Sequence, residues 1–103
     1  MVYKTVSSQQ LARLPTQPGV YIFRDKENRA IYIGKAKSLR SRVRSYFQKS
    51  KRSLKTEQMI RRIKTLETMV VGSETEALIL EANLIKEYRP YFNVRMRDDK
   101  TYP

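Results

Sequence analysis

Apolar residues in the first third of the chain change from helical spacing to strand-like spacing. Residues 8–14 predict a short helix that Pro15 stops. Residues 20–24 and 29–34 are rich in β-branched and aromatic side chains, which favours two strands. The polar residues 25–28 between them predict a turn, so the unit is expected to be a β-hairpin.

The register of this hairpin decides which side chains share a face. Pairing across residues 25–28 places Tyr21 directly opposite Tyr32 on one face. The same register puts apolar pairs on the other face, Ile22 with Ile31 and Val20 with Ile33, and sets Arg24 opposite Arg29. Both faces of the sheet would then be apolar, which predicts a covering layer on each side.

The second half of the chain predicts two further helices and a third strand. Residues 38–47 have helical spacing with Ser38 as N-cap, and residues 56–64 form a basic amphipathic helix. The polar, basic residues 48–55 between them predict a mobile surface connection. Residues 66–71 alternate as a strand does.

A fourth helix follows the third strand. The residues Ser73-Glu74-Thr75-Glu76 fit the capping-box pattern, so this helix is expected to begin near Glu74. Because Pro90 disfavours helical geometry at Arg89, the helix should end at Tyr88. The tail beyond it is expected to be irregular.

The charge of the chain points to a polyanionic partner. Lys and Arg number 22 against 10 Asp and Glu, which leaves a formal net charge of +12 in 103 residues. Such a surface binds nucleic acid through counterion release, although an anionic membrane attracts the same charge. No apolar run approaches the length of roughly 20 residues that a membrane span needs, and no signal-peptide pattern is present.

The absence of cysteine and histidine limits the kinds of chemistry that this chain can perform. With no cysteine, the fold cannot rest on disulfides, which suits a reducing cytoplasm. With no histidine, the commonest general base and the commonest transition-metal ligand are both missing. Any catalysis must therefore use Tyr, Lys, Arg and carboxylates.

Glu81 is the most informative acidic residue. At about 100° per residue it falls within the apolar stripe of the fourth helix, whose other members are Ala77, Leu78, Leu84, Ile85 and Tyr88. Burying an unpaired charge costs several kcal/mol, so Glu81 should have a positive partner. Both a core salt bridge to arginine and a bound metal ion satisfy this requirement.

The arginines of residues 38–47 cannot share one task. Arg42 projects about 160° away from Arg40 and Arg44. Arg42 flanks the apolar stripe beside Tyr46, where it can bind a phosphate or simply snorkel to solvent.

Paired tyrosines on a hairpin are by themselves more often ordinary core or surface aromatics.

Two tripeptides of the hairpin, Gly19-Val20-Tyr21 and Tyr32-Ile33-Gly34, resemble the motif halves of the GIY-YIG nuclease family, with Val20 replacing the usual isoleucine. Four single residues also stand where the family's motifs place a Lys, Arg, Glu and Asn: Lys35, Arg42, Glu81 and Asn93. Further stretches resemble the family branch that forms the N-terminal domain of the nuclease subunit in bacterial nucleotide excision repair. They include Leu14-Pro15, Glu74-Thr75-Glu76-Ala77-Leu78, Asn83-Leu84-Ile85-Lys86 and Asp98-Asp99-Lys100-Thr101-Tyr102-Pro103.

The resemblance implies an α+β fold, with a three-stranded antiparallel sheet flanked by helices. It implies an endonuclease that cuts on the 3′ side of a DNA lesion, on damaged duplex handed over by UvrB. Subunits of this branch are much longer, so residues 1–103 would be one domain excised from a longer chain. The isolated domain is expected to be a cytoplasmic monomer.

These residues suggest a mechanism for hydrolysing a phosphodiester. Glu81 would hold one Mg²⁺ or Mn²⁺, because a hard cation that keeps most of its waters needs few carboxylates. Tyr32 would be the general base, ionising below the usual phenol pKa of about 10, with Tyr21 positioning it. Arg42 would stabilise the pentavalent phosphorane.

The remaining candidates support these groups or contact DNA. Lys35 would bias Tyr32 toward phenolate, Asn93 would orient the phosphate or a metal-bound water, and Gly34 would let the DNA backbone approach closely. The predicted backbone contacts are Lys37, Arg40, Arg44, Arg61 and Arg62. A non-enzymatic basic nucleic-acid-binding module remains the alternative, because charge alone cannot exclude it.

Overall fold

The computed structural model describes residues 2–3, 7–48 and 53–94. Four strands form one antiparallel sheet in the order β1-β4-β2-β3, and four helices flank it. The strands are β1 (Val2–Tyr3), β2 (Gly19–Arg24), β3 (Ala30–Ala36) and β4 (Thr65–Val70). The helices are α1 (Ser8–Ala12), α2 (Leu39–Tyr46), α3 (Leu54–Arg62) and α4 (Glu74–Tyr88).

The predicted α+β fold is confirmed. The three long strands make the expected antiparallel sheet, and the short β1 adds an unpredicted strand beside β4. The predicted connection at 48–55 lies partly outside the described residues, and its last two residues already belong to α3. The motif stretch at 98–103 lies wholly outside them. Within the described segments, no helix is long and apolar enough to cross a membrane.

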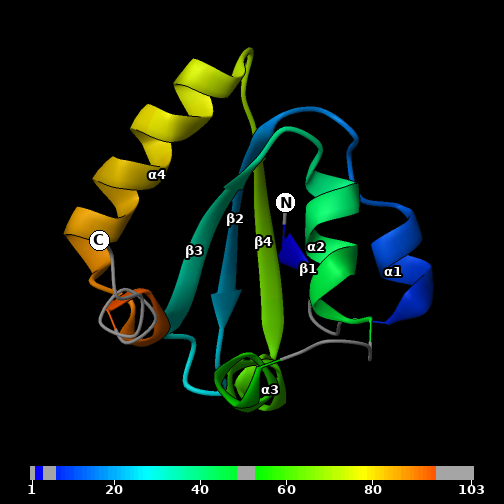
Figure 1. The fold of residues 1–103 in the computed structure, drawn as a ribbon, viewed down its shortest axis with the longest axis vertical. Helices are drawn as coiled ribbons and strands as arrows, with labels where there is room; N and C mark the ends of the chain where they lie inside the picture. Colours follow the sequence, from blue (N-terminus) through cyan, green and yellow to red (C-terminus); the bar gives the residue numbers. More distant parts are fainter. Residues whose placement is uncertain (1, 4–6, 49–52, 95–103) are drawn as a thin grey trace.

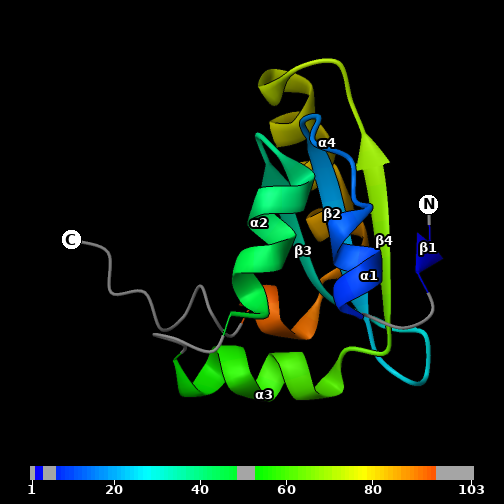
Figure 2. The same cartoon turned by 90° about the vertical axis from the view of Figure 1, so that its right-hand side faces the viewer.

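The sheet is covered on both faces, as its two apolar surfaces predict. Helices α1 and α2 lie on one face and α4 lies on the other, while α3 crosses the end of the sheet (Figures 1 and 2). One buried cluster fills the α1–α2 side and includes Tyr21, Phe23 and Leu39. A second cluster, Val20, Ile22, Ile33 and Ala77, lies beneath α4.

The predicted hairpin register is wrong by two residues. Tyr21 pairs with Gly34, and Tyr32 pairs with Phe23. A two-residue shift keeps every side chain on its predicted face, so Tyr21 and Tyr32 still share one side of the sheet. Ile31 is the exception, because the register shifts between Phe23 and Arg24 and Ile31 packs in the Tyr21 cluster.

The turn explains this shift. Arg24 pairs with Ala30, so the connection takes in residues 25–29 and not 25–28. The Asp25 carboxylate accepts hydrogen bonds from the backbone N–H groups of Glu27 and Arg29, both at 3.0 Å. Asn28 takes the positive φ of 62° that the turn requires, a conformation asparagine tolerates.

Serine caps begin the helices, and proline ends the longest one. Ser38 and Ser73 accept hydrogen bonds from the backbone N–H groups of Ser41 and Glu76, which confirms both as N-caps. The predicted capping box differs in its second half, because the Glu76 carboxylate accepts from Gly72 and not from Ser73. Helix α4 ends at Tyr88 as predicted, but residues 91–94 form a further helical turn where an irregular tail was expected.

Arg89 ends α4 in the left-handed region, with φ 45° and ψ 59°. Most L-residues avoid this region, whereas glycine adopts it without a steric penalty. We therefore expect Arg89→Gly to raise the free energy of unfolding by roughly 0.5 kcal/mol, as the difference between relieved strain and added chain entropy. Urea denaturation followed by circular dichroism measures this, and a destabilised variant would contradict the assignment of strain.

Candidate active site

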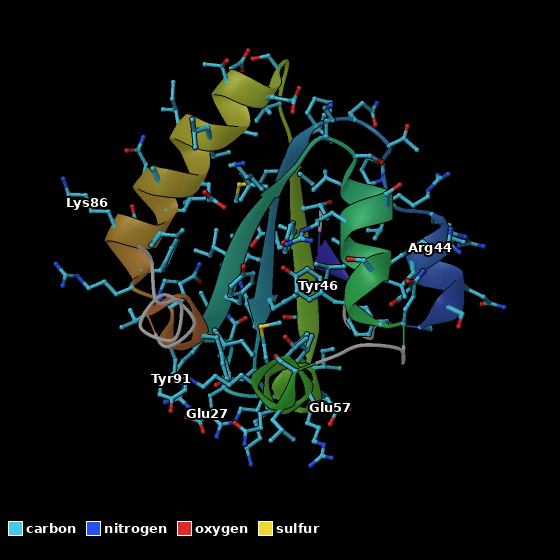
Figure 3. All side chains as sticks on the ribbon, in the orientation of Figure 1. Glu27, Arg44, Tyr46, Glu57, Lys86 and Tyr91 are labelled. Atoms are coloured by element: carbon cyan, nitrogen blue, oxygen red, sulfur yellow. The ribbon has the colours of Figure 1, made fainter. Side chains whose placement is uncertain are left out.

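Three tyrosines gather on the face of the sheet that α2 covers. Tyr21 from β2 and Tyr46 from α2 share a hydrogen bond of 2.8 Å between their hydroxyls. The ring centroid of Tyr32, from β3, lies 6.3 Å from that of Tyr21 and 6.1 Å from that of Tyr46. Phe23 contacts the rings of all three. Tyr46 is labelled beside α2 in Figure 3.

Gly34 makes room for this cluster. A Cβ built on Gly34 would lie 2.2 Å from the Tyr21 hydroxyl oxygen, closer than any real contact. Gly34 is buried, so the close approach predicted for a DNA backbone is instead made by the protein's own phenol. Gly34 of the Tyr32-Ile33-Gly34 motif therefore provides the space into which Tyr21 of the Gly19-Val20-Tyr21 motif packs.

We expect Gly34→Ala to destabilise the fold by about 1–3 kcal/mol, because Tyr21 is only 1% exposed and its ring has no space to retreat. Gly72→Ala is the matched control, since its Cβ would meet only the end of the exposed Glu76 side chain. Thermal unfolding of both variants checks this. If Gly34→Ala and Gly72→Ala unfold at the same temperature, the close contact with Tyr21 is not the reason that position 34 requires glycine.

Burial dominates the acidity of the three phenols. Desolvation raises the pKa of Tyr21 to about 12, and the neighbouring Tyr32 adds to it. Desolvation also raises the pKa of Tyr32 and of Tyr46 above the ordinary phenol value. Arg42 opposes these shifts, but it does not reverse them. In the metal-free protein all three phenols are therefore protonated at neutral pH, and the lowered pKa predicted for Tyr32 stays a prediction for the protein with a dication bound.

Arg42 and Tyr46 act as one unit on α2. The Arg42 guanidinium donates a 3.3 Å hydrogen bond to the Tyr46 hydroxyl and lies 5.1 Å from the ring centroid. Arg42 also interacts with the Tyr21 hydroxyl, but the residue is exposed, so the N–H groups that the phenols leave unused are open to a ligand. Its predicted divergence from the neighbouring arginines is confirmed, because Arg40 instead donates to the Leu14 carbonyl at 2.8 Å.

Glu81 lies on the sheet-facing side of α4. The described apolar contacts of this helix come from Ala77, Leu80, Leu84 and Ile85, and Glu81 falls between them. It is half-buried, whereas the predicted stripe members Leu78 and Tyr88 are 51% and 45% exposed. The Glu81 carboxylate is close enough to raise the pKa of the Tyr32 phenol. Helix α4 packs against edge strand β3, which carries Tyr32, so the Glu81 carboxylate lies within electrostatic range of that phenol.

Asn93 stands beside the cluster but binds the backbone of β3. Its amide oxygen accepts a hydrogen bond from the N–H of Ile33, and its amide nitrogen donates to the Ile33 carbonyl, both at 2.8 Å. Ile33 lies between Tyr32 and Gly34, so Asn93 fixes the strand that carries both. The amide of Asn93 therefore positions β3, and its predicted role in orienting a phosphate or a metal-bound water stays a prediction.

The basic residues predicted for the site or for DNA contact lie partly here and partly on other surfaces of the domain. Lys35, Lys37 and Arg42 line a shallow groove with three serines of α2 and its N-cap. Arg44 is exposed, whereas Arg40 uses its Nε–H to bind the Leu14 carbonyl, and the DNA contacts predicted for both stay predictions. Arg61 and Arg62 are exposed on α3, at the end of the sheet.

Tyr46 is the site residue that the sequence prediction missed. Its helical spacing alone predicts an apolar core position. The signal was available, because residues four apart lie on one helical face and Arg42 precedes Tyr46 by four. A phenol placed beside a candidate phosphate-binding arginine is a polar group with a partner, and not only a core aromatic.

Comparisons with known proteins identify the family of this chain. A family model of the UvrC-like GIY-YIG domain matches residues 17–94. The UvrABC system protein C of Gemmatimonas aurantiaca is 58% identical over 97 residues, which cover 93% of this chain and 16% of that protein. The same protein of Caldicellulosiruptor saccharolyticus is 56% identical over 94 residues, covering 91% and 16%. The chain thus spans about a sixth of these curated relatives.

Solved structures of one relative match the fold as well. The GIY-YIG N-terminal endonuclease domain of UvrC from Thermotoga maritima, bound to its catalytic divalent cation magnesium, superposes with a TM-score of 0.74 and 48% identity. The match covers 82% of this chain and 91% of that one. Point mutants of that domain, with tyrosine changed to phenylalanine at one of three positions or asparagine changed to alanine, also match and hold the cation. The chain belongs to the GIY-YIG nuclease family and, within it, to the N-terminal endonuclease domains of UvrC.

Proposed function

We propose that this domain hydrolyses a DNA phosphodiester with one bound divalent cation, and that in its longer protein it makes the 3′-side incision at a lesion. The observation that carries the proposal is the phenol cluster, with Arg42 hydrogen-bonded to Tyr46 and the Glu81 carboxylate within electrostatic range of Tyr32. These groups supply a proton acceptor, a phosphate ligand and a cation ligand, which phosphodiester hydrolysis requires.

The donor set fits a single, largely hydrated cation. Among the described residues, no group of three or more His, Cys, Asp or Glu side chains could enclose a metal ion. Mg²⁺ keeps several waters and is often bound through only one or two carboxylates, which Glu81 can provide. In the Thermotoga maritima domain the cation remains bound when a tyrosine hydroxyl or an asparagine amide is removed. That retention supports a carboxylate as the protein ligand here, with either Mg²⁺ or Mn²⁺ as the ion.

The side chains of the cluster divide the chemistry. Tyr32 is more accessible than the buried Tyr21, so it is the phenol that can accept a proton from an attacking water. Tyr21 orients Tyr46, which in turn holds Arg42. The outward N–H groups of Arg42 bind the phosphoryl oxygens, where negative charge grows as the phosphorus–oxygen bond breaks. A bound dication would polarise the phosphoryl group and place positive charge beside the Tyr32 phenol.

Supporting residues complete the site. Lys35 and Lys37 line the groove beside Arg42 and bind the adjacent backbone phosphates. Asn93 holds β3 through its two hydrogen bonds to Ile33, which keeps the adjacent Tyr32 in position. In the full-length context the domain receives damaged duplex DNA from UvrB, and it acts in the cytoplasm.

Nicking of supercoiled plasmid tests this function against the non-enzymatic alternative. We expect nicking in Mg²⁺ or Mn²⁺, and none in EDTA, because the dication supplies transition-state charge stabilisation. A second arm adds UvrB and lesion-containing duplex, since presentation of the DNA can limit the isolated domain. Nicking that persists in EDTA, or no incision in either arm with metal present, contradicts the proposal.

A further inference from the structure

A second basic surface lies at the end of the sheet, away from the phenol cluster. The hairpin turn, the last turn of α3 and the C-terminal end of α4 meet there around a groove of about 640 Å³. Its lining includes Arg24, Arg29, Arg62 and Arg89, with Tyr88 and Tyr91 between them. Figure 3 shows Tyr91 and Glu27 at this end of the molecule, whereas Tyr46 lies higher beside α2.

Two of these arginines are already neutralised within the protein. Arg24 pairs with Glu67 at 3.2 Å, and Arg29 pairs with Asp25 at 3.1 Å and Glu27 at 3.5 Å. For Arg62 and Arg89, the described part of the chain shows no ion pair. These two guanidinium groups therefore carry the uncompensated charge of the groove.

Aromatic rings hold Arg62 in place. Its guanidinium carbon lies 5.7 Å from the Tyr91 ring centroid and 5.5 Å from that of Phe92. Cation–π contacts restrict the arginine without using its N–H groups, which remain available to bind an anion. An arginine ordered before binding loses less entropy when it captures a phosphate.

Arg89 gives an independent sign of function. It occupies the left-handed C-cap of α4 at φ 45°, a position that favours glycine. Residues held in sparsely populated backbone regions cluster at functional sites. Its side chain lines the same groove as Arg62.

We propose that Arg62 and Arg89 form a second DNA-backbone-binding surface, which holds phosphates of the substrate several nucleotides from the scissile bond. The inference rests on the proposed function, because it takes DNA as the ligand. The longest dimension of the domain is 34 Å, about ten base pairs at a rise of 3.4 Å, so one DNA segment can reach both surfaces. Contact at two separated points would fix the direction of the DNA across the site.

Fluorescence anisotropy with labelled DNA in EDTA tests this surface without cleavage. The variant R62A/R89G is compared with R13A/K86A, which removes the same charge from exposed positions outside the groove. We expect R62A/R89G to weaken binding at least fivefold more than the control, and to lower the salt slope by about two for a duplex. Single-stranded and duplex arms show which form the surface prefers. Arg89→Gly relieves backbone strain, so loss of folding should not confuse the result.

The outcomes separate this surface from the nuclease proposal. If R62A/R89G binds as the control does in both arms while wild type still nicks in Mg²⁺, the surface is wrong and the nuclease function stands. If R62A/R89G loses binding while wild type fails to incise even with UvrB, the surface is supported and the nuclease function is wrong.

Discussion

Glu81→Gln is expected to lower metal-dependent cleavage by about 10²- to 10³-fold, while DNA binding changes little. Glutamine keeps the size and hydrogen bonding of the side chain but loses the charge that holds a dication. The Glu81 carboxylate lies within electrostatic range of the Tyr32 phenol and is not among the residues that line the two basic grooves proposed to contact DNA. Single-turnover incision and anisotropy in EDTA measure the two quantities separately.

Glu87→Gln is the matched control on the same helix. Glu87 is exposed and lies outside the sheet-facing side of α4, so its variant should cleave at the wild-type rate. Glu81→Ala should behave as Glu81→Gln does, with an additional small change in stability. Full activity in either Glu81 variant would refute the assignment of this carboxylate to the cation.

Tyr32→Phe is expected to reduce the cleavage rate by about a hundredfold or more, because general acid–base catalysis contributes that much. The ring remains and keeps its stacking on Phe23, so the fold should be unaffected. Only the hydroxyl that accepts the proton is lost. Incision rates with saturating metal, together with thermal unfolding, separate loss of chemistry from loss of structure.

The pH dependence provides a second readout. Burial raises the pKa of the Tyr32 phenol, so wild-type activity should rise with pH while the phenol is mostly protonated. A Tyr32→Phe enzyme with the wild-type rate and the same pH dependence would exclude this phenol as the base.

The sequence predicted the faces of the sheet better than its pairing. The alternation of side chains along the strands correctly placed Tyr21 and Tyr32 on one face. The register error of two residues did not change this, because side-chain direction repeats every two residues. The turn length could not be read from the polar tetrad, since the Asp25 carboxylate extends the turn to Arg29 through its own hydrogen bonds. Side chain-to-backbone bonds of this kind depend on the folded geometry.

The same limit applies to the site. Periodicity placed Glu81 on the inner side of α4, and helical angles separated Arg42 from Arg40. Neither the periodicity nor the helical angles could show that Asn93 binds the backbone of β3, because Ile33 is distant from Asn93 in the sequence. The raised pKa values of the phenols also depend on burial by residues from several elements, which no local pattern records.

The most direct test of the central claim is anomalous diffraction from a crystal of this domain soaked in Mn²⁺. We expect one strong peak within about 2.5 Å of a Glu81 carboxylate oxygen, beside the Tyr32 phenol, with water completing the coordination. The peak should vanish in Glu81→Gln. A cation bound elsewhere in the wild-type domain, or a peak that survives in the variant, would contradict the account.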